Sequence, residues 1–148
     1  MIKKTTKDKA YSTESYQEYL ETILRIFNER EKENQDDYIS NIEIAQRLEI
    51  KPPSVTEFLA KLQKEGLIEW EKRKGVKLSK KGYDLAVRVL DMHRLLEKFF
   101  SVVLELDDET LKHRVACALE HELMNEPKLV NALERSIVKI EAIHSTKE

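Results

Sequence analysis

Four side chains that can bind a transition metal occur at helical spacing around residue 117. They are His113, Cys117, Glu120 and His121. In a helix that turns by about 100° per residue, these four positions fall within an arc of roughly 100°. A thiolate, a carboxylate and imidazoles on one helix face are ligands for a divalent transition metal. The spacing therefore predicts a metal-binding face.

Two other predicted helices carry further pairs of ligand-type residues. His93 and Glu97 are one turn apart, and Glu18 and Glu21 share a face of the first helix. Taken singly, each of these residues has an ordinary interpretation, such as a surface carboxylate or a structural histidine. Cys117, between two alanines, would then be a small core residue. Three helices that each offer at least two ligand-type groups favour a metal site.

The charge distribution points to a second kind of partner. The net charge is −2 and the pI is near 6.1, which argues against binding to nucleic acid. From Lys51 to Gly82, however, there are nine basic and four acidic residues, with acidic segments on both sides. Because the local field governs association more than the total charge does, this segment indicates a DNA-binding surface.

The segment before residue 66 has the pattern of a helix-turn-helix. Ser40 and Glu43 form a capping-box pattern that starts a short helix through Leu48. Lys51-Pro52-Pro53 ends it, because a residue that precedes proline is disfavoured in the α region. Pro53 suits the first turn of the next helix, which buries Val55, Phe58, Leu59 and Leu62 and ends at Gly66.

Residues 67–78 change to a period of two and predict a two-stranded hairpin with a basic tip. Helix, turn, helix and hairpin together make a winged helix-turn-helix. A long amphipathic helix over 12–30 precedes it, followed by a solvated connection over 29–37. Helical periods then predict helices over 81–103, over 109–125 and from Pro127 onward.

We therefore expect a mostly α fold with two domains. Residues 1–82 form a winged helix-turn-helix DNA-binding domain with a two-stranded wing. Residues 83–148 form a helical metal-binding and dimerisation domain, since apolar stripes on its last helices favour contact between two copies. The longest apolar run, over 99–104, is too short to span a bilayer. The single cysteine and the lack of a signal-peptide pattern favour a cytoplasmic protein.

The candidate DNA contacts lie early in the second helix of the pair and at the hairpin tip. A recognition helix uses residues near its N-terminus to read base edges, while flanking cations contact phosphates. Glu57 could accept a hydrogen bond from a cytosine amino group, or instead act as the capping partner of Ser54. The candidates are Lys51, Pro53, Ser54, Thr56 and Glu57 on the helix, with Arg73 and Lys74 on the hairpin.

Five sequence segments together resemble a known family. The chain is similar to the iron- and manganese-dependent repressors of the diphtheria toxin repressor and manganese transport regulator family, from about Ser12 to Leu133. The matching segments are Glu18-Tyr19-Leu20-Glu21-Thr22-Ile23, Pro53-Ser54-Val55-Thr56, Lys64-Glu65-Gly66-Leu67-Ile68, His93-Arg94-Leu95-Leu96-Glu97 and Cys117-Ala118-Leu119-Glu120-His121. The resemblance implies a homodimeric winged-helix repressor that binds operator DNA and is controlled by Mn²⁺ or Fe²⁺.

The resemblance also implies two sets of metal ligands. The primary set would be Glu18, Cys117, Glu120 and His121, and a neighbouring ion would use Glu21, His93, Glu97 and His113. Iron-type members typically have methionine at the position of Glu18, and manganese-type members have aspartate. Cysteine at position 117 is typical of the iron type, whereas the manganese transport regulator has glutamate. Since Glu18 is a hard ligand and Cys117 a soft one, ligand softness does not choose between the two metals.

The chain reaches only residue 148, so we expect it to lack the carboxy-terminal SH3-like domain of longer members, together with any ligand that this domain supplies. Three alternatives stay open. One is a winged-helix regulator without metal control, answering a small organic effector or none, and another is a protein-interaction module. The third is a metal-dependent hydrolytic enzyme, against which the sequence has no Gly-rich phosphate loop and no Ser-His-Asp order.

Overall fold

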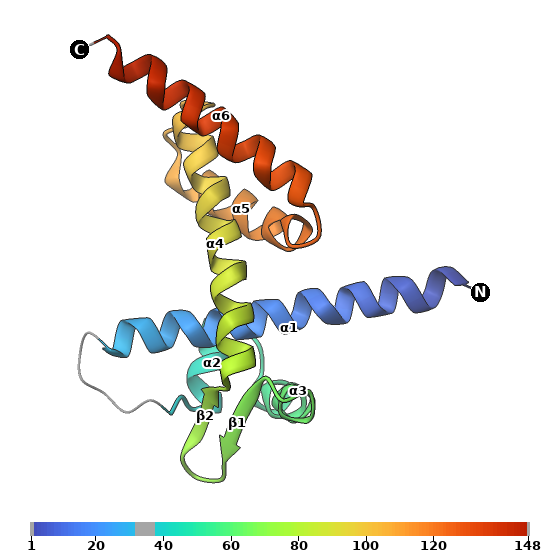
Figure 1. Cartoon of the computed structure of the whole chain (residues 1–148). Coiled ribbons are helices and arrows are strands. Elements are labelled where there is room, and N and C mark those ends of the chain that lie inside the picture. The colour runs from blue at the N-terminus through green and yellow to red at the C-terminus, as the bar shows by residue number, and fades with distance from the viewer. Residues whose placement is uncertain (1, 32–37, 148) are drawn as a thin grey trace. The chain divides into compact units, whose positions relative to one another are not determined.

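The computed structural model describes the backbone of residues 2–31 and 38–147, and the side chains of residues 15–30 and 38–147. The chain divides into two compact units, the first ending at Val87 and the second starting at Arg88. The boundary falls within one helix, α4 (Lys80–Val102), so each unit contains a part of it. Figure 1 shows the order of the elements along the chain.

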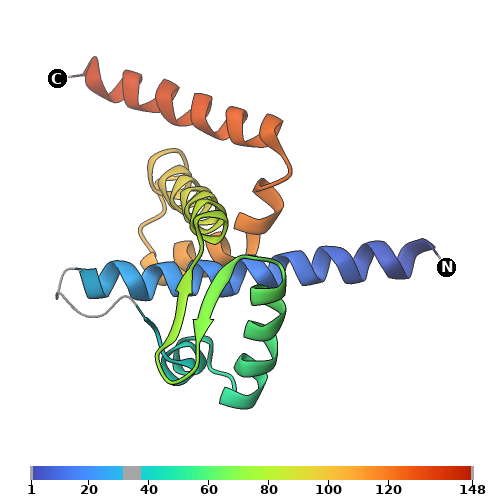
Figure 2. The same cartoon turned by 60° about the horizontal axis from the view of Figure 1, so that its bottom comes forward.

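The first unit is a winged helix-turn-helix behind a long helix. Its elements are α1 (Ile2–Glu31), α2 (Asn41–Leu48), α3 (Pro52–Lys64), β1 (Ile68–Glu71) and β2 (Gly75–Leu78). The strands pair antiparallel, from Ile68 opposite Leu78 to Glu71 opposite Gly75. Helix α1 starts ten residues earlier than the predicted residue 12, and residues 32–37 of the predicted connection lie outside the described residues. In Figures 1 and 2, α2, α3 and the hairpin all lie on one side of α1.

Apolar side chains from all of these elements form the core of the first unit. The buried side chains include Leu20, Ile23 and Leu24 of α1, Ile44 of α2, Val55, Leu59 and Leu62 of α3, Ile68 of β1, Val76 of β2, and Ile39. Ile39 and Val76 also exchange two backbone hydrogen bonds of 2.8 Å, which tie the segment before α2 to the wing. Phe58, predicted to be buried, is half-buried, and its ring stacks on Tyr19 of α1 with ring centroids 4.2 Å apart.

The predicted capping box at the start of α2 is confirmed. The Glu43 backbone N–H donates to the Ser40 hydroxyl at 3.2 Å, and the Ser40 backbone N–H donates to the Glu43 carboxylate at 3.1 Å. Arg30 of α1 forms an ion pair with the same carboxylate. Partial burial would raise the pKa of Glu43, but hydrogen bonds from Arg30 and Ser40 outweigh it and lower the pKa from 4.5. The ionised carboxylate therefore holds α2 and α1 together.

This lowered pKa predicts a specific acid sensitivity. Since Glu43 titrates below its unfolded value, its stabilising effect is complete above pH 4.5 and is lost as the pH falls through the folded pKa. We expect the free energy of unfolding to fall less steeply between about pH 5 and about pH 3 in Glu43→Gln than in the wild type. Urea unfolding at a series of pH values measures this pH dependence, and Glu65→Gln, at an exposed position, is the control. Equal slopes in all three proteins would contradict the prediction.

The second unit is a three-helix assembly made of the rest of α4, α5 (Glu109–Leu123) and α6 (Pro127–Ser145). Asp108 caps α5 by accepting a hydrogen bond of 2.9 Å from the Leu111 backbone N–H. Helix α5 ends at Leu123, two residues before the predicted end, and Pro127 opens α6 as predicted. The buried core consists of Leu96, Phe100, Ala116, Leu123 and Leu133. None of the helices in the described parts of the chain combines the length and the apolar character that a membrane span requires.

Candidate metal centre and DNA-binding surface

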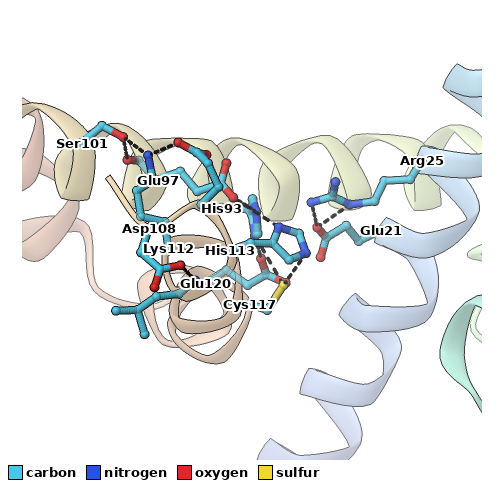
Figure 3. Close-up of polar contacts among 12 residues, drawn as sticks. Glu21, Arg25, His93, Glu97, Ser101, Asp108, Lys112, His113, Cys117 and Glu120 are labelled. Carbon is cyan, nitrogen blue, oxygen red and sulfur yellow. Dashed lines mark hydrogen bonds and ion pairs between the residues drawn. The ribbon is translucent and has the colours of Figure 1, made fainter. Parts of the chain in front are cut away.

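His93 lies at the centre of a polar cluster between α4 and α5. Its side chain is buried, and both ring nitrogens contact carboxylates. Nδ1 lies 2.7 Å from Glu120 Oε2 on α5, and Nε2 lies 2.9 Å from Glu97 Oε1, one turn further along α4. Figure 3 shows these side chains converging from the two helices. The cluster lies entirely within the second unit.

The pKa values of this cluster favour a charged pair. Burial would lower the pKa of His93, but hydrogen bonds and charges from Cys117 and Glu97 outweigh it and raise the pKa above 6.5. Burial would likewise raise the pKa of Glu97, and the two imidazoles His93 and His113 lower it from 4.5. The imidazole and the carboxylate thus stabilise each other's ionised form.

The thiol lies beside two imidazoles. Cys117 Sγ lies 3.7 Å from His93 Nδ1 and 3.6 Å from His113 Nε2. His113 Nδ1 in turn lies 3.2 Å from Glu97 Oε1. The ligand atoms of His93, His113 and Cys117 are all within 4.8 Å of one another. Two imidazoles, a thiol and an adjacent carboxylate form a mixed nitrogen, sulfur and oxygen donor set, which fits a borderline divalent transition metal.

His121 stands at the edge of the cluster. Its Nε2 lies 3.4 Å from Glu120 Oε1, so Glu120 joins two imidazoles, one from each helix. The structure therefore brings together six of the eight ligand residues predicted from the sequence, which are His93, Glu97, His113, Cys117, Glu120 and His121. It does not separate them into the two predicted sets, because Cys117 contacts His93 and His113 of the other set.

The remaining two predicted ligands, Glu18 and Glu21, lie on α1 in the first unit. Glu18 is exposed, and its backbone carbonyl accepts a hydrogen bond of 2.8 Å from Thr22. Arg25 donates two hydrogen bonds, of 2.7 and 3.0 Å, to one oxygen of Glu21. Arg25 was missed in the sequence, although its spacing of four residues from Glu21 is the signal that could have found it.

The predicted recognition helix exposes the side chains expected to contact DNA. Lys51, Pro53, Ser54, Thr56 and Glu57 are all exposed, while Val55 and Leu59 face the core. Lys51 is the N-cap of α3 and no side chain caps this helix, so the alternative capping role of Glu57 is wrong. Thr56 Oγ1 accepts a hydrogen bond of 2.8 Å from the Asn41 amide, which joins α3 to α2.

The wing carries its basic tip on an aromatic support. Tyr38 donates a hydrogen bond of 2.8 Å to Glu71, and this bond lowers the pKa of that exposed carboxylate from 4.5. The Nζ atoms of Lys74 and Lys77 lie 5.6 and 5.4 Å from the Tyr38 ring centroid. Lys74 also pairs with Glu71 at 3.0 Å, whereas Arg73 is exposed in a left-handed conformation with φ of 73°. Tyr38, missed in the sequence, holds these lysines in place.

Comparisons with known proteins agree with this architecture. Residues 12–76 match the family described as iron dependent repressor, N-terminal DNA binding domain. Residues 79–142 match the family described as iron dependent repressor, metal binding and dimerisation domain. The chain therefore belongs to the iron-dependent repressor family, whose members are transcriptional regulators and not enzymes.

Individual relatives agree with this assignment. An uncharacterized HTH-type transcriptional regulator of Methanocaldococcus jannaschii is 34% identical over 114 residues, which is 77% of this chain and 86% of that protein. The HTH-type transcriptional regulator MntR of Bacillus subtilis is 31% identical over 112 residues, or 76% of this chain and 73% of that protein.

A solved structure, that of the manganese regulator SloR, is 32% identical with a TM-score of 0.62. The match covers 81% of this chain and 52% of that one, so this chain spans about half the length of the solved relative.

Proposed function

We propose that this chain is a homodimeric transcriptional repressor that binds operator DNA when a divalent metal, Mn²⁺ or Fe²⁺, is bound. The observation that carries the proposal is the convergence of two imidazoles, a thiol and a carboxylate within the domain that the family comparison matches to metal binding. Two similar proteins support it by their names: MntR is named a transcriptional regulator, and SloR is named a manganese regulator.

We assign the metal ligands as the family resemblance implies. Glu18, Cys117, Glu120 and His121 form the primary site, and Glu21, His93, Glu97 and His113 serve a second ion. A bound divalent ion would supply the positive charge that lets several carboxylate and thiolate ligands lie close to one another. In the structure, the two ring nitrogens of His93 hold Glu120 and Glu97 in place, and one of them would leave its carboxylate to bind the second ion. We propose that residues 1–82 form the DNA-binding domain and residues 83–148 the metal-binding and dimerisation domain.

The dimer is proposed from apolar side chains that the second unit leaves exposed. Exposed leucines, valines and isoleucines in one region are typical of an interface between subunits. Val138 is 64% exposed and Ile143 is 50% exposed, both on α6. The others in this unit are Leu104, Leu119 and Leu129. A symmetric dimer presents two recognition helices to successive major grooves of a palindromic operator.

The DNA contacts follow from exposure and charge. Ser54, Thr56 and Glu57 of α3 would read base edges. The Lys51 ammonium would contact a neighbouring phosphate, with Pro53 beside it in the first turn of the helix. Arg73 and Lys74 at the wing tip would contact the phosphate backbone or the minor groove, where cations are favoured. Such contacts impose a steep dependence of affinity on salt concentration.

Metal removal tests the proposal. An operator is first selected from a random duplex pool by the protein in the presence of Mn²⁺. At fixed salt and pH, we expect a mobility shift on this operator with Mn²⁺ or Fe²⁺ and its loss on adding a chelator. A panel of divalent ions then ranks the metals. Full operator affinity in excess chelator would refute metal control.

A second candidate is a winged-helix regulator that answers a small organic effector, and one feature favours it. A cavity of about 270 Å³ lies between α1, the wing and the start of α4 in the first unit. Its wall is apolar at Ile23, Phe27 and Ile39, and Lys77 and Lys80 stand at its polar side. A chelator-insensitive operator shift would support this function over the metal-dependent one.

A further inference from the structure

Helices α4 and α5 meet along a ladder of polar contacts with regular spacing. His93, Glu97 and Ser101 follow one another at four-residue intervals on α4, which places them on one face. Lys112, Ala116 and Glu120 have the same spacing on α5. The two rows run in opposite directions, because His93 contacts Glu120 at one end and Ser101 contacts Lys112 at the other.

Lys112 is an unusual residue in this ladder because its charged side chain is buried. It is 5% exposed, and burial of an ammonium group is costly unless the group is fully hydrogen-bonded. Its Nζ donates to Ser101 Oγ at 2.9 Å and pairs with Glu109 Oε1 at 2.5 Å. Ser101 Oγ donates in turn to the Glu97 backbone carbonyl at 3.0 Å. Figure 3 shows this chain of contacts from α5 to α4.

The middle residue of the α5 row does not fix the register. Ala116 is fully buried there and has no polar group, so it allows close approach of the helices without specifying their alignment. Shape-filling apolar contacts tolerate small shifts better than hydrogen bonds do, since hydrogen bonds weaken steeply with distance and angle. The contact of Lys112 with Ser101 therefore supplies a directional constraint at the end of the ladder opposite Glu120.

We propose that Lys112, acting through Ser101, is a positioning residue for the metal centre. It holds α5 in the register that places His113 against Glu97 and Glu120 against His93. Lys112 immediately precedes the proposed ligand His113, and Ser101 lies one turn after the proposed ligand Glu97. Lys112 and Ser101 therefore act beside the metal ligands without binding the ion. The functional meaning of this register rests on the proposed metal-dependent function.

The first test is metal affinity. Lys112→Met keeps the aliphatic stem and removes the ammonium group, and Ser101→Ala removes its acceptor. Because loss of a residue that orients metal ligands costs 10- to 100-fold in affinity, we expect Co²⁺ to bind each variant about 10-fold more weakly, with an altered Co²⁺ absorption spectrum. Ser101→Thr, which keeps the hydroxyl, should bind as the wild type does.

Two matched controls separate positioning from general effects. Lys98→Met removes a lysine of α4 whose partner, Glu141 on α6, is exposed, and should leave Co²⁺ affinity unchanged. Leu133→Ala weakens the core of the same unit without removing any of the ladder's polar groups, so it should lower stability but not Co²⁺ affinity. Combining Lys112→Met with Ser101→Ala should weaken binding no more than one change alone, since both remove the same contact.

A second readout needs no metal. In the metal-free protein, NMR should show a downfield, slowly exchanging imidazole N–H of His93 from its hydrogen bond to Glu120. We expect this resonance in the wild type and in Lys98→Met, and its loss or broadening in Lys112→Met and Ser101→Ala. Persistence of the resonance in both variants would overturn the proposal, as would unchanged Co²⁺ affinity. If even the wild type fails to bind Co²⁺, the proposed function fails and the NMR comparison alone decides the positioning role.

Discussion

Replacing Cys117 by alanine is expected to abolish metal-stimulated DNA binding while leaving a folded dimer. Its sulfur lies 3.6 and 3.7 Å from two imidazole nitrogens, so the side chain sits where a metal ligand set converges. Changes to residues that only support a ligand cost 10- to 100-fold in metal affinity, so loss of a ligand itself should cost about 100-fold or more. The half-buried position of Cys117 tolerates alanine without a large cavity.

His121→Ala should have the same effect for the same reason. The matched control is His144→Ala, because His144 is an exposed histidine near the end of α6 and outside the cluster. Mobility-shift titrations with Mn²⁺ and Fe²⁺, each with a chelator arm, measure the stimulation. Circular dichroism and sedimentation verify that the variants remain folded and dimeric.

The results separate the possible assignments. Stimulation by metal that is unchanged in both Cys117→Ala and His121→Ala would remove these residues from the site. If metal stimulates DNA binding by His121→Ala but not by Cys117→Ala, the site is instead built on Cys117, His93 and His113. The ligand atoms of these three residues lie together in the second unit. Loss of basal, metal-free DNA binding in His144→Ala would show that the assay reports general damage.

Local features of the sequence predicted most of the fold. The capping box at Ser40 and Glu43, the proline at the start of α3 and the change to a period of two after Gly66 each depend on residues close together in the chain. Such signals work because helix ends and tight turns are stabilised by neighbouring backbone and side-chain groups. The grouping of ligand-type side chains on one face of α5 could also be predicted, because spacing along a single helix determines which residues share a face.

Contacts between distant residues could not be predicted in this way. Spacing on one helix shows which residues share a face, but not which residue of another helix meets them. The contact of Cys117 with His93, across the two predicted ligand sets, is of this kind. So are the hydrogen bond from Lys112 to Ser101 and the hydrogen bond from Tyr38 to Glu71, each of which joins residues that are far apart in the sequence.

The tight junction between the hairpin and α4 gives the largest expected effect on stability. Gly82 lies in the first turn of α4, and a Cβ atom added there would lie 1.9 Å from the Leu67 backbone oxygen. That oxygen is held in place, because it accepts a hydrogen bond of 3.1 Å from the Ser79 backbone N–H. The Gly82 backbone N–H donates to the Ser79 hydroxyl at 3.0 Å. The start of α4 cannot move away without breaking these bonds.

Gly82→Ala should therefore destabilise the first unit by about 2–3 kcal/mol, as overpacking of a rigid contact does. Within a helix, replacing glycine by alanine usually raises the free energy of unfolding by about 1 kcal/mol, so the change expected here has the opposite sign. Gly66→Ala is the comparison, since an added Cβ meets nothing within 4 Å there and only the left-handed φ of 72° opposes it, at about 1–2 kcal/mol. Urea unfolding followed by the fluorescence of Trp70, the single tryptophan, reports on this unit. A Gly82→Ala protein as stable as the wild type would show that α4 does not approach the Leu67 carbonyl this closely.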